Sequence, residues 1–261
     1  MRWVLAFALA MPVSAFAQDG GAEREMSTDR PDKTESPYTV PDGRVQIEMD
    51  AATYTRDRIG DVVGESVGVA PVNFKLGIGR DTDVQLIVEP YLRQTMRDLN
   101  SGARAANAGF GDVTLRLKHN LWGNDDGTTA FGLMPFVKLP TNSGGVGNGR
   151  VEAGLIAPLA IELSDSVALG LMSELDLVEN GAADGYRVNV IHSATAGFSL
   201  TEKLGLYTEL YTERGDDWIV TGDAGVTYRL IDTLQIDTGV NLGISDAADD
   251  VAVFAGVSRR F

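Results

Sequence analysis

The chain contains few residues of the types that usually carry out catalysis. It has no cysteine, which excludes a thiol nucleophile, a thiolate metal site and a disulfide framework. It has two histidines, His119 and His192, and only His192 is followed directly by a serine, Ser193. These two neighbours lie in an alternating segment, where successive side chains point to opposite faces of a strand. His192 and Ser193 therefore cannot act as a base and its nucleophile, and we expect a protein that is not an enzyme.

Two further groups of residues suggest ligand binding by their composition alone. The pair Asp125-Asp126 and the run at residues 246–250 could touch Ca²⁺ weakly, but neither has the ligand spacing of a dedicated site. Residues 141–150 include four glycines, as phosphate loops do, yet they lack the Gly-Lys-Ser/Thr ending. We therefore interpret the acidic runs as solvated turns and residues 141–150 as a mobile external loop, and we expect no metal and no cofactor.

The remaining candidates are charged and tyrosine side chains that recur at every second position, between apolar residues. In residues 113–121, for example, Arg116 and Lys118 alternate with Leu115 and Leu117. This pattern is typical of a strand with one polar and one apolar face. If all the polar faces line one lumen, the candidates for contact with a solute are Glu48, Asp50, Lys75, Glu89, Tyr91, Arg93, Arg116, Lys118, Lys138, Glu174, Asp176, Arg187, Tyr207, Glu209, Tyr211, Asp223, Arg229 and Asp237.

The elements that would hold these side chains begin at Arg44 and continue to the C-terminal Phe261. We expect twelve strands, with a bulge at Pro90, because a paired strand needs the N–H groups that proline lacks. The second strand alternates least regularly. The expected strands are residues 44–54, 66–78, 84–93, 112–121, 128–140, 151–162, 167–177, 187–200, 204–213, 218–229, 234–244 and 251–261.

The connections between these strands alternate in length. Short turns fall near residues 79–82, 123–127, 164–166, 201–203 and 231–233, and longer links fall at 57–65, 98–108, 141–150, 179–185, 214–217 and 245–250. Bacterial outer-membrane barrels follow this rule, with short turns in the periplasm and longer loops outside. A secreted β-sandwich, the soluble alternative, has no reason to follow it. The sequence therefore predicts an all-β fold, a transmembrane up-and-down antiparallel β-barrel formed by residues 44–261.

The last strand supports closure of such a barrel. Val251, Val253, Ala255 and Val257 share one face, and Phe261 falls on the same parity. The final strand of a barrel must pair with the first one to close the sheet. We expect Phe261 to take part in this closure and to be a signal for the outer-membrane assembly machinery.

The free energy of transfer decides which face meets the lipid. A charged residue on the lipid face near the midplane costs roughly 2–4 kcal/mol. The polar faces together carry many acids and bases, so these faces must line the interior. Phe198, Tyr228 and Phe261 at the periplasmic strand ends, with Tyr186 and Trp218 at the outer ends, then fall where aromatic girdles belong.

The N-terminus predicts export from the cytoplasm. Residues 1–17 contain Arg2, an apolar run and then Ala15-Phe16-Ala17, which is typical of a signal peptide cleaved after Ala17. Cleavage lowers Lys+Arg from 22 to 21 against 37 Asp+Glu, a net charge of −16 that argues against nucleic acid as a partner. No later segment approaches the ~18 consecutive apolar residues of a membrane helix. We expect the outer membrane of a Gram-negative bacterium, with its lipid as a partner.

Residues 18–43 differ from the rest of the chain. They are polar, contain Pro31, Pro37 and Pro41, and show neither a strand nor a helix period. Two interpretations remain open. The segment is either a disordered periplasmic tail or an insert in the lumen, where its charges could pair with the wall.

Two stretches carry a family resemblance. At residues 28–50, TDRPDKTESPYTVPDGRVQIEMD, and again at 109–127, GFGDVTLRLKHNLWGNDDG, the chain resembles a family of bacterial outer-membrane transporters that is named after the meta-pathway of phenol degradation. The likeness covers the whole mature chain and is most distinctive at residues 28–48. It implies an outer-membrane channel or transporter, linked in some cases to the uptake of aromatic compounds.

The function of the lumen has two interpretations. Its charges could pair across a filled interior, or they could line a narrow pore whose excess of acids favours cations and neutral solutes over anions. Tyr54, Tyr91, Tyr207 and Tyr211 could stack on an aromatic solute or merely fill space. We predict passive passage of small solutes. The alternative is a non-conducting surface barrel that binds a partner through its external loops.

Overall fold

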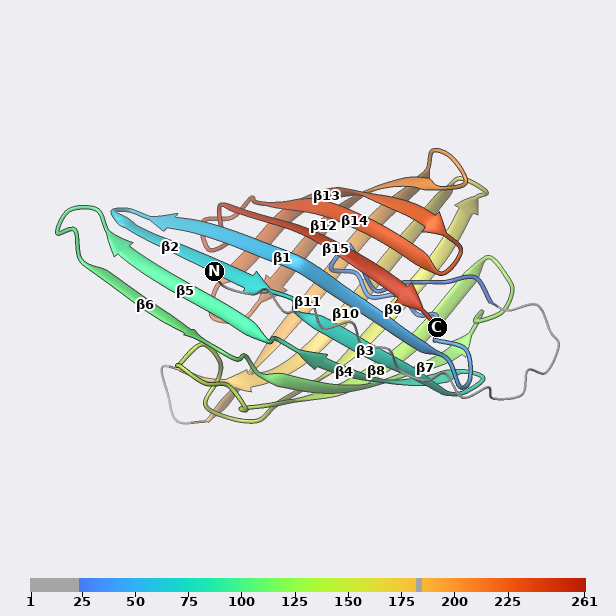
Figure 1. Ribbon diagram of the computed structural model, residues 1–261, viewed down its shortest axis with the longest axis horizontal. Helices are drawn as coiled ribbons and strands as arrows, with labels where there is room; N and C mark the ends of the chain where they lie inside the picture. The colour runs from blue at the N-terminus through green and yellow to red at the C-terminus, as the bar shows by residue number, and fades with distance from the viewer. Residues whose placement is uncertain (1–23, 182–184) are drawn as a thin grey trace, which may run out of the picture.

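The computed structural model describes residues 24–181 and 185–261, and every regular element in these two ranges is a strand (Figure 1). The expected signal peptide and its cleavage site at Ala17 lie outside the described residues. In these ranges no helix is long and apolar enough to cross a bilayer. The strands are β1 (Val45–Ile59), β2 (Val62–Val69), β3 (Val72–Gly79), β4 (Thr82–Val88), β5 (Tyr91–Asp98), β6 (Arg104–Gly109), β7 (Val113–Trp122), β8 (Thr129–Leu139), β9 (Glu152–Ser164), β10 (Val167–Glu179), β11 (Tyr186–Ser199), β12 (Leu204–Arg214), β13 (Trp218–Ile231), β14 (Leu234–Gly243) and β15 (Val251–Arg260).

The strands form one antiparallel sheet that closes on itself. β15 pairs with β14 on one side and with β1 on the other, the latter over ten residue pairs. The N–H of Phe261 donates to the carbonyl of Val45 at 2.8 Å, so the last residue is bonded to the first strand. Three passes of the chain along the wall are each interrupted once, so that each is divided into two strands: β2 and β3, β4 and β5, and β6 and β7. The fifteen strands therefore correspond to twelve passes along the wall, which we call crossings. The prediction of a closed barrel of about twelve strands is confirmed.

From β7 to β15 the two faces of the wall have the predicted character. Lys118 and Glu209 on the inner face are 1% and 4% exposed, whereas Leu117 and Leu210 on the outer face are 37% and 50% exposed. Residues that are paired across antiparallel strands point to the same face. The pairing register therefore assigns each residue of the neighbouring strands to the inner or the outer face. The outer face is therefore an apolar band, and the charges of these strands face inward.

In the first four crossings, the residues that point inward change from even to odd numbers, or from odd to even, partway along the chain. β1 has a register shift at Ala51. The neighbouring crossings leave the ladder at Ala70-Pro71, at Glu89-Pro90 and at residues 110–112. Neither proline can donate an N–H to the ladder, and the left-handed φ of 57° at the alanine before Pro71 turns the chain there. Each irregularity moves every later side chain to the opposite face.

The pairing beyond these breaks corrects three predicted positions. Tyr54 pairs with Val253, which lies on the outer face of β15. Val67 then connects Tyr54 to Arg93 across β2. Tyr54, Arg93 and, two residues from it, Tyr91 therefore lie on the outer face. Their predicted place in the lumen is wrong, because the alternation was counted through the breaks without allowing for them.

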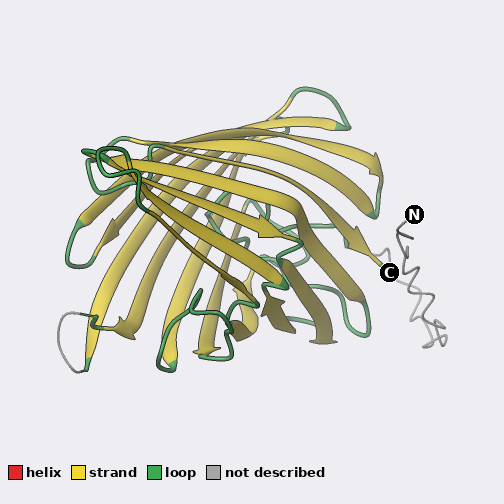
Figure 2. Ribbon diagram, turned by 60° about the vertical axis from the view of Figure 1, so that its left-hand side comes forward, coloured by secondary structure: helices red, strands yellow, loops and turns green. Residues whose placement is uncertain are grey.

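The parts of these crossings on the far side of the breaks form a four-stranded extension of the wall (Figures 1 and 2). It consists of residues 52–59 of β1 with β2, β5 and β6, and we call it the flap. Residues 57–65 and 98–108, predicted as loops, belong largely to its strands, which end in turns at Gly60 and Gly102 with φ of 61° and 72°. Within the described ranges β6 pairs with β5 alone, so the flap has one free edge.

Site-specific labelling tests the exchange of faces, because the chain has no native cysteine. A fluorescent label on Tyr91→Cys should be quenched by brominated lipid, since position 91 lies on the outer face at the lipid boundary. A label on Leu92→Cys should be quenched less than about half as strongly, because successive residues point to opposite faces. The reverse order would show that the alternation continues unbroken through Pro90.

Candidate functional site

Residues 24–43 lie inside the barrel and contact inward-facing side chains of the wall (Figure 1). The segment leads into β1 beside β3, where the N–H of Gly43 donates to the carbonyl of Gly77 at 3.0 Å. Because it has no regular structure of its own, its backbone N–H groups are available to acceptors on the wall. We call it the luminal segment. Its wall partners come from β1, β3, β4, β7, β10, β11, β12, β13 and β14.

Asp29 is the centre of the largest charge cluster. Its two carboxylate oxygens contact the ammonium groups of Lys75 on β3 and Lys118 on β7. Lys75 also pairs with Glu48 of β1, whose carboxylate accepts the N–H of Asp29 at 3.0 Å. Burial, the largest influence, raises the pKa of Asp29, but Lys118 and Lys75 outweigh it and hold that pKa well below 3.8. All these side chains are at most 6% exposed, so each charge depends on its partners.

Arg30 connects the two strands that flank β15. Its guanidinium lies 2.7 Å from Asp50 of β1 and 2.7 Å from Asp237 of β14. It also lies 5.6 Å from the centre of the Phe254 ring on β15. Gly256 of β15 leaves the necessary space, since a Cβ there would lie 2.2 Å from a guanidinium nitrogen. Because β15 closes the barrel against β1, Arg30 bridges the closing seam from the inside.

Glu209 of β12 binds the next part of the luminal segment. Its carboxylate accepts the backbone N–H groups of Lys33 at 2.9 Å and Thr34 at 2.8 Å. The ammonium of Lys33 lies 3.3 Å from Asp223 and 4.4 Å from the centre of the Tyr211 ring. Three residues that the sequence predicted as lumen lining therefore contact the luminal segment, and the segment lies against this part of the wall.

An apolar patch on the inner face escaped the sequence prediction. Met172 accepts the N–H of Glu35 through its sulfur at 3.4 Å, and the Glu35 side chain pairs with Arg116 at 2.6 Å. Residues 153–161 are almost entirely apolar on both parities, so alternation gave no signal there. The patch lies on β8 to β11 and consists of Met134, Ile156, Met172 and Ile191, with Phe136 and Tyr211 packed against it.

Residues 141–150, predicted as a mobile external loop, are bonded to the inside of the wall. Asp112 accepts hydrogen bonds from the Asn142 side chain at 2.8 Å and from the backbone N–H of Asn148 at 2.7 Å. Val146 of the same loop is 6% exposed. A cavity of about 400 Å³ lies beside it, lined by Lys138, Asn148, Glu152, Val178, Glu179, Gly181, Arg187 and Asn189. The loop therefore narrows the mouth of the barrel on this side.

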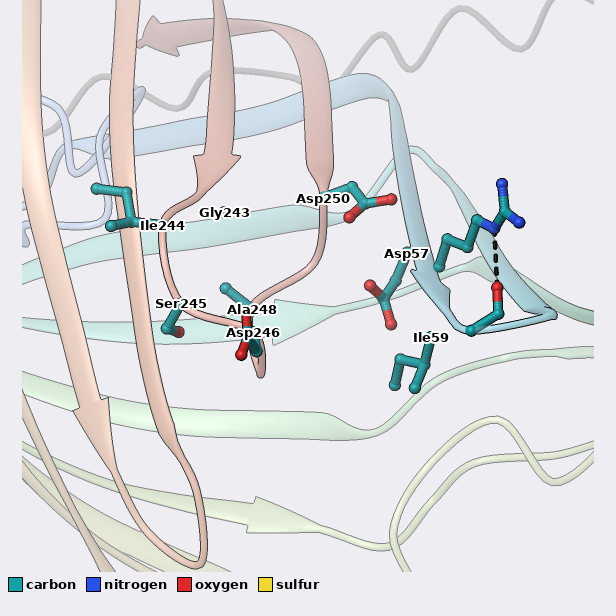
Figure 3. A pocket seen from close by; sticks show the side chains of 10 residues that line it. Asp57, Ile59, Gly243, Ile244, Ser245, Asp246, Ala248 and Asp250 are labelled. Carbon is teal, nitrogen blue, oxygen red and sulfur yellow. Dashed lines mark hydrogen bonds between the residues drawn. The ribbon is translucent and has the colours of Figure 1, made fainter.

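A second cavity, of about 410 Å³, lies at the mouth between the end of β1 and the connection from β14 to β15 (Figure 3). Asp57 and Ile59 line it from β1, and Asp246 and Asp250 line it from the connection. Its lining contains three aspartates and one base, Arg58, and this excess of acids favours cations and neutral solutes over anions. In residues 24–181 and 185–261, no group of three or more His, Asp or Glu side chains is arranged to hold a metal ion.

Apart from Tyr91 and Arg93, the predicted lumen residues lie on the inner face. Two of them pair with groups not singled out beforehand, since Arg229 contacts Glu25 and Arg187 contacts Asp216. The inner face carries Glu48, Asp50, Lys75, Glu89, Arg116, Lys118, Lys138, Glu174, Asp176, Arg187, Tyr207, Glu209, Tyr211, Asp223, Arg229 and Asp237.

The histidines lie on the outer face. The ring Nδ1 of His192 is 3.0 Å from the hydroxyl of Ser173, while the adjacent Ser193 points inward and bonds Thr34 at 2.6 Å. The ring Nδ1 of His119 is likewise 2.8 Å from a hydroxyl, that of Thr82. Each hydroxyl provides a hydrogen-bond partner for an imidazole nitrogen that lies on an apolar surface. Neither histidine has a carboxylate within ion-pair distance in the described part of the chain, so no triad is formed there.

Comparison with known proteins agrees with this architecture. The family described as "Putative MetA-pathway of phenol degradation" matches residues 28–261. An outer membrane channel from Pseudomonas putida F1, known from a crystal structure, is similar with a TM-score of 0.67 and 13% identity, over 90% of this chain and 100% of that one. The translocator domain of the autotransporter NalP from Neisseria meningitidis gives 0.51 and 14%, over 84% and 88%. The KdgM porin gives 0.50 and 9%, over 83% and 99%.

No curated protein matches the sequence. At these identities the solved structures show the fold, a barrel of the kind found in Gram-negative outer membranes. This fold agrees with the predicted location in the outer membrane, which is confirmed.

Proposed function

Because the chain belongs to the phenol-degradation family and forms a closed outer-membrane barrel, we propose that it is a channel for the passive passage of small solutes, aromatic compounds among them. In this proposal the luminal segment closes the lumen at rest. The observation that carries it is the mode of attachment of that segment. Charged side chains of the wall hold it through ion pairs and hydrogen bonds, of which those at Asp29, Arg30 and Glu209 are the most buried.

Polar attachment supports a removable closure. When the luminal segment leaves, water can hydrate Lys75, Lys118 and the wall carboxylates, so the lost ion pairs are replaced by hydration. A segment held by apolar packing would instead expose that surface to water at about 25 cal/mol per Å². The closed and open states of a polar lumen can therefore be close in free energy.

The apolar patch supports the preference for aromatic solutes. It lies in a lumen that is otherwise polar, and Phe136 and Tyr211 adjoin it. An aromatic ring that passes along β8 to β11 would gain contacts there that a sugar of similar size would not gain. The alternative of a partner-binding barrel has less support, because residues 141–150 fold inward and the turns at Gly60 and Gly102 are tight.

A liposome uptake assay tests this function. Wild-type protein should admit phenol-sized aromatic solutes, and Ile156→Asn should slow that uptake by about fivefold, because one buried aliphatic contact is worth roughly 1 kcal/mol. Uptake of a small sugar should change little. The matched control is Leu155→Asn, one residue away on the outer face, which should leave the selectivity unaltered. Liposomes that exclude both solutes, with wild-type protein folded and inserted, would contradict the proposed channel.

The docking of the luminal segment should depend on pH through Asp32. Burial, followed by the negative charge of Glu209, raises the pKa of Asp32 to about 8, and Tyr207 and Thr195 also face it. In a released segment the pKa returns towards 3.8. Between these values the docked form binds more protons, so rising pH favours release. We expect the open probability to increase from pH 5 to about 8.

Asp29 acts in the opposite range. Docking of the luminal segment lowers the pKa of Asp29. The contribution of Asp29 to the stability of the docked state is therefore complete above pH 3.8 and is lost as the pH falls below that value. Conductance recorded from pH 3 to 9 should therefore be lowest near pH 4 to 5. Because burial also raises the pKa of Glu35 in the same segment, Asp32→Asn should reduce the alkaline rise without abolishing it. Asp232→Asn, in an exposed turn, should leave the profile unchanged. An alkaline rise as large in Asp32→Asn as in wild type would refute the role of Asp32.

A further inference from the structure

The outer face of the flap carries a second distinctive arrangement, separate from the lumen. The flap extends past the neighbouring strands at the end opposite the C-terminus, which is the external end if the termini are periplasmic (Figure 1). Its β2, β5 and β6 pair with one another and with the end of β1. The outward side chains of this surface therefore lie beyond the apolar band, at the level of the outer leaflet headgroups.

The register shows which side chains share this outer face. One row across the flap contains Arg58, Val63, Arg97 and Arg104. The next row towards the barrel contains Arg56, Glu65, Thr95 and Ala106. The third contains Tyr54, Val67, Arg93 and Ala108. The outer face of the flap thus carries five arginines and one acid, in a chain that has 37 acids against 22 bases.

Three of these arginines have no acidic partner in the described part of the protein, whereas Arg56 lies opposite Glu65 and Arg58 donates to the carbonyl of Gly60 at 2.9 Å. Among the described residues, no carboxylate lies within ion-pair distance of Arg93, Arg97 or Arg104. The single acid, Glu65, accepts a hydrogen bond from the Tyr54 hydroxyl at 2.8 Å. Arg97 and Arg104 are direct cross-strand partners. Like charges in directly opposed positions destabilise a sheet, and an external anion bound between them would relieve this repulsion.

The position of the arginines limits what that anion can be. Tyr54 and Tyr91 lie on the same face nearer the barrel, where an aromatic girdle marks the boundary of the hydrocarbon. From Tyr91 to Arg97 the strand advances roughly 20 Å, at about 3.4 Å per residue. The arginines therefore lie where phosphorylated sugars of the outer leaflet glycolipid are found. Guanidinium groups bind phosphate oxygens in pairs, with both charge and geometry matched.

We infer that the outer face of the flap binds the phosphorylated glycolipid of the outer leaflet, with Arg58, Arg93, Arg97 and Arg104 contacting its phosphates. The bound phosphates relieve the repulsion between Arg97 and Arg104 and anchor the free edge of the sheet at β6. Passage of solutes through the lumen does not enter this inference, so it stands or fails independently of the proposed channel.

A binding titration on the full folded chain in uncharged detergent tests the inference. Diphosphoryl lipid A should bind, and the double variant Arg97→Gln/Arg104→Gln should weaken its apparent Kd at least about tenfold, because two guanidinium–phosphate contacts are lost. The matched control is Lys203→Gln/Arg214→Gln, which removes the same charge outside the flap and should leave the Kd unchanged. Equal weakening in both variants, or none in the flap variant, would overturn the inference.

The choice of probes identifies the ligand chemistry. Dephosphorylated lipid A should not bind to this face, and inorganic phosphate should bind far more weakly than diphosphoryl lipid A. If phosphatidylglycerol bound as tightly as diphosphoryl lipid A, the surface would recognise any anionic lipid and the assignment to the glycolipid would be wrong. Binding of dephosphorylated lipid A with an unchanged Kd would also overturn it, since acyl chains would then account for the contact.

A stability measurement separates binding from misfolding. Without glycolipid, Arg97→Gln/Arg104→Gln should unfold at the same temperature as wild type or a higher one, because a repulsive pair is removed. With diphosphoryl lipid A, wild type should gain stability and the variant should gain much less. A variant that unfolds earlier than wild type without lipid would show that the two arginines stabilise the flap themselves, which would contradict the inference.

Discussion

Asp29→Asn should raise the mean conductance of single channels in planar bilayers, on the order of fivefold, towards the level of a variant that lacks residues 24–40. The neutral side chain leaves Lys118, which is 1% exposed, without a carboxylate partner, while Lys75 keeps Glu48. An unpaired buried charge costs about 3–5 kcal/mol, which opposes docking of the segment against the ion pairs of Arg30, Lys33 and Glu35 that remain. Release of the luminal segment lets water hydrate the lysine, so the open state becomes the more stable one.

Compensation provides the control. Asp29→Asn/Lys118→Met removes the unpaired charge together with its partner, so the segment should dock again and conductance should fall back towards wild type. If the double variant conducts as well as Asp29→Asn, the buried lysine is not the reason for release. If deletion of residues 24–40 leaves the conductance unchanged, the luminal segment is not the barrier.

Arg30→Gln should lower the unfolding temperature of the barrel by about 10 °C, measured by the loss of the compact band in unheated gel samples. The substitution leaves Asp50 and Asp237 facing each other across β15 without the cation that lies 2.7 Å from each. Asp237 has a fully buried side chain, so its charge cannot be screened where it lies. The two acids also flank the strand that closes the barrel.

Arg80→Gln is the matched control for this loss. Arg80 pairs with Asp125 at 2.7 Å, but its side chain is 78% exposed. An exposed pair contributes little, so no measurable shift is expected. A second variant, Gly256→Val, should mimic Arg30→Gln, because the new side chain would occupy the space of the guanidinium. Equal unfolding temperatures for wild type, Arg30→Gln and Arg80→Gln would show that the seam is stabilised by its backbone pairing alone.

Alternation predicted most of the fold because lipid and lumen impose opposite preferences on successive residues. Lys118 beside Leu117 and Glu209 beside Leu210 are placed correctly for this reason. The same rule failed at Tyr91 and Arg93, since the break at Glu89-Pro90 changes the parity and a single sequence does not show how many residues a break absorbs. The expected bulge at Pro90 was recognised, but its effect on the following side chains was not.

The candidate site was predicted only as a set of polar residues. That Glu209 binds the backbone of Lys33 and Thr34, and that Arg30 reaches Asp50 and Asp237, depends on how an irregular segment passes through the interior. No periodicity describes such a path. Ile156 was missed for a different reason, because its strand is apolar on both parities and alternation therefore does not show which face points inward.

The bond between Gly43 and Gly77 ties the luminal segment to the wall at the start of β1. A tethered chain of this length competes for its own binding groups at an effective concentration on the order of millimolar. Any solute that uses the same carboxylates and lysines must therefore displace an intramolecular rival, so a dilute polar solute is excluded unless it binds more tightly. A solute that binds the apolar patch displaces the hydrogen bond from Glu35 to Met172 rather than an ion pair, so the tethered segment selects between solutes by their chemical class.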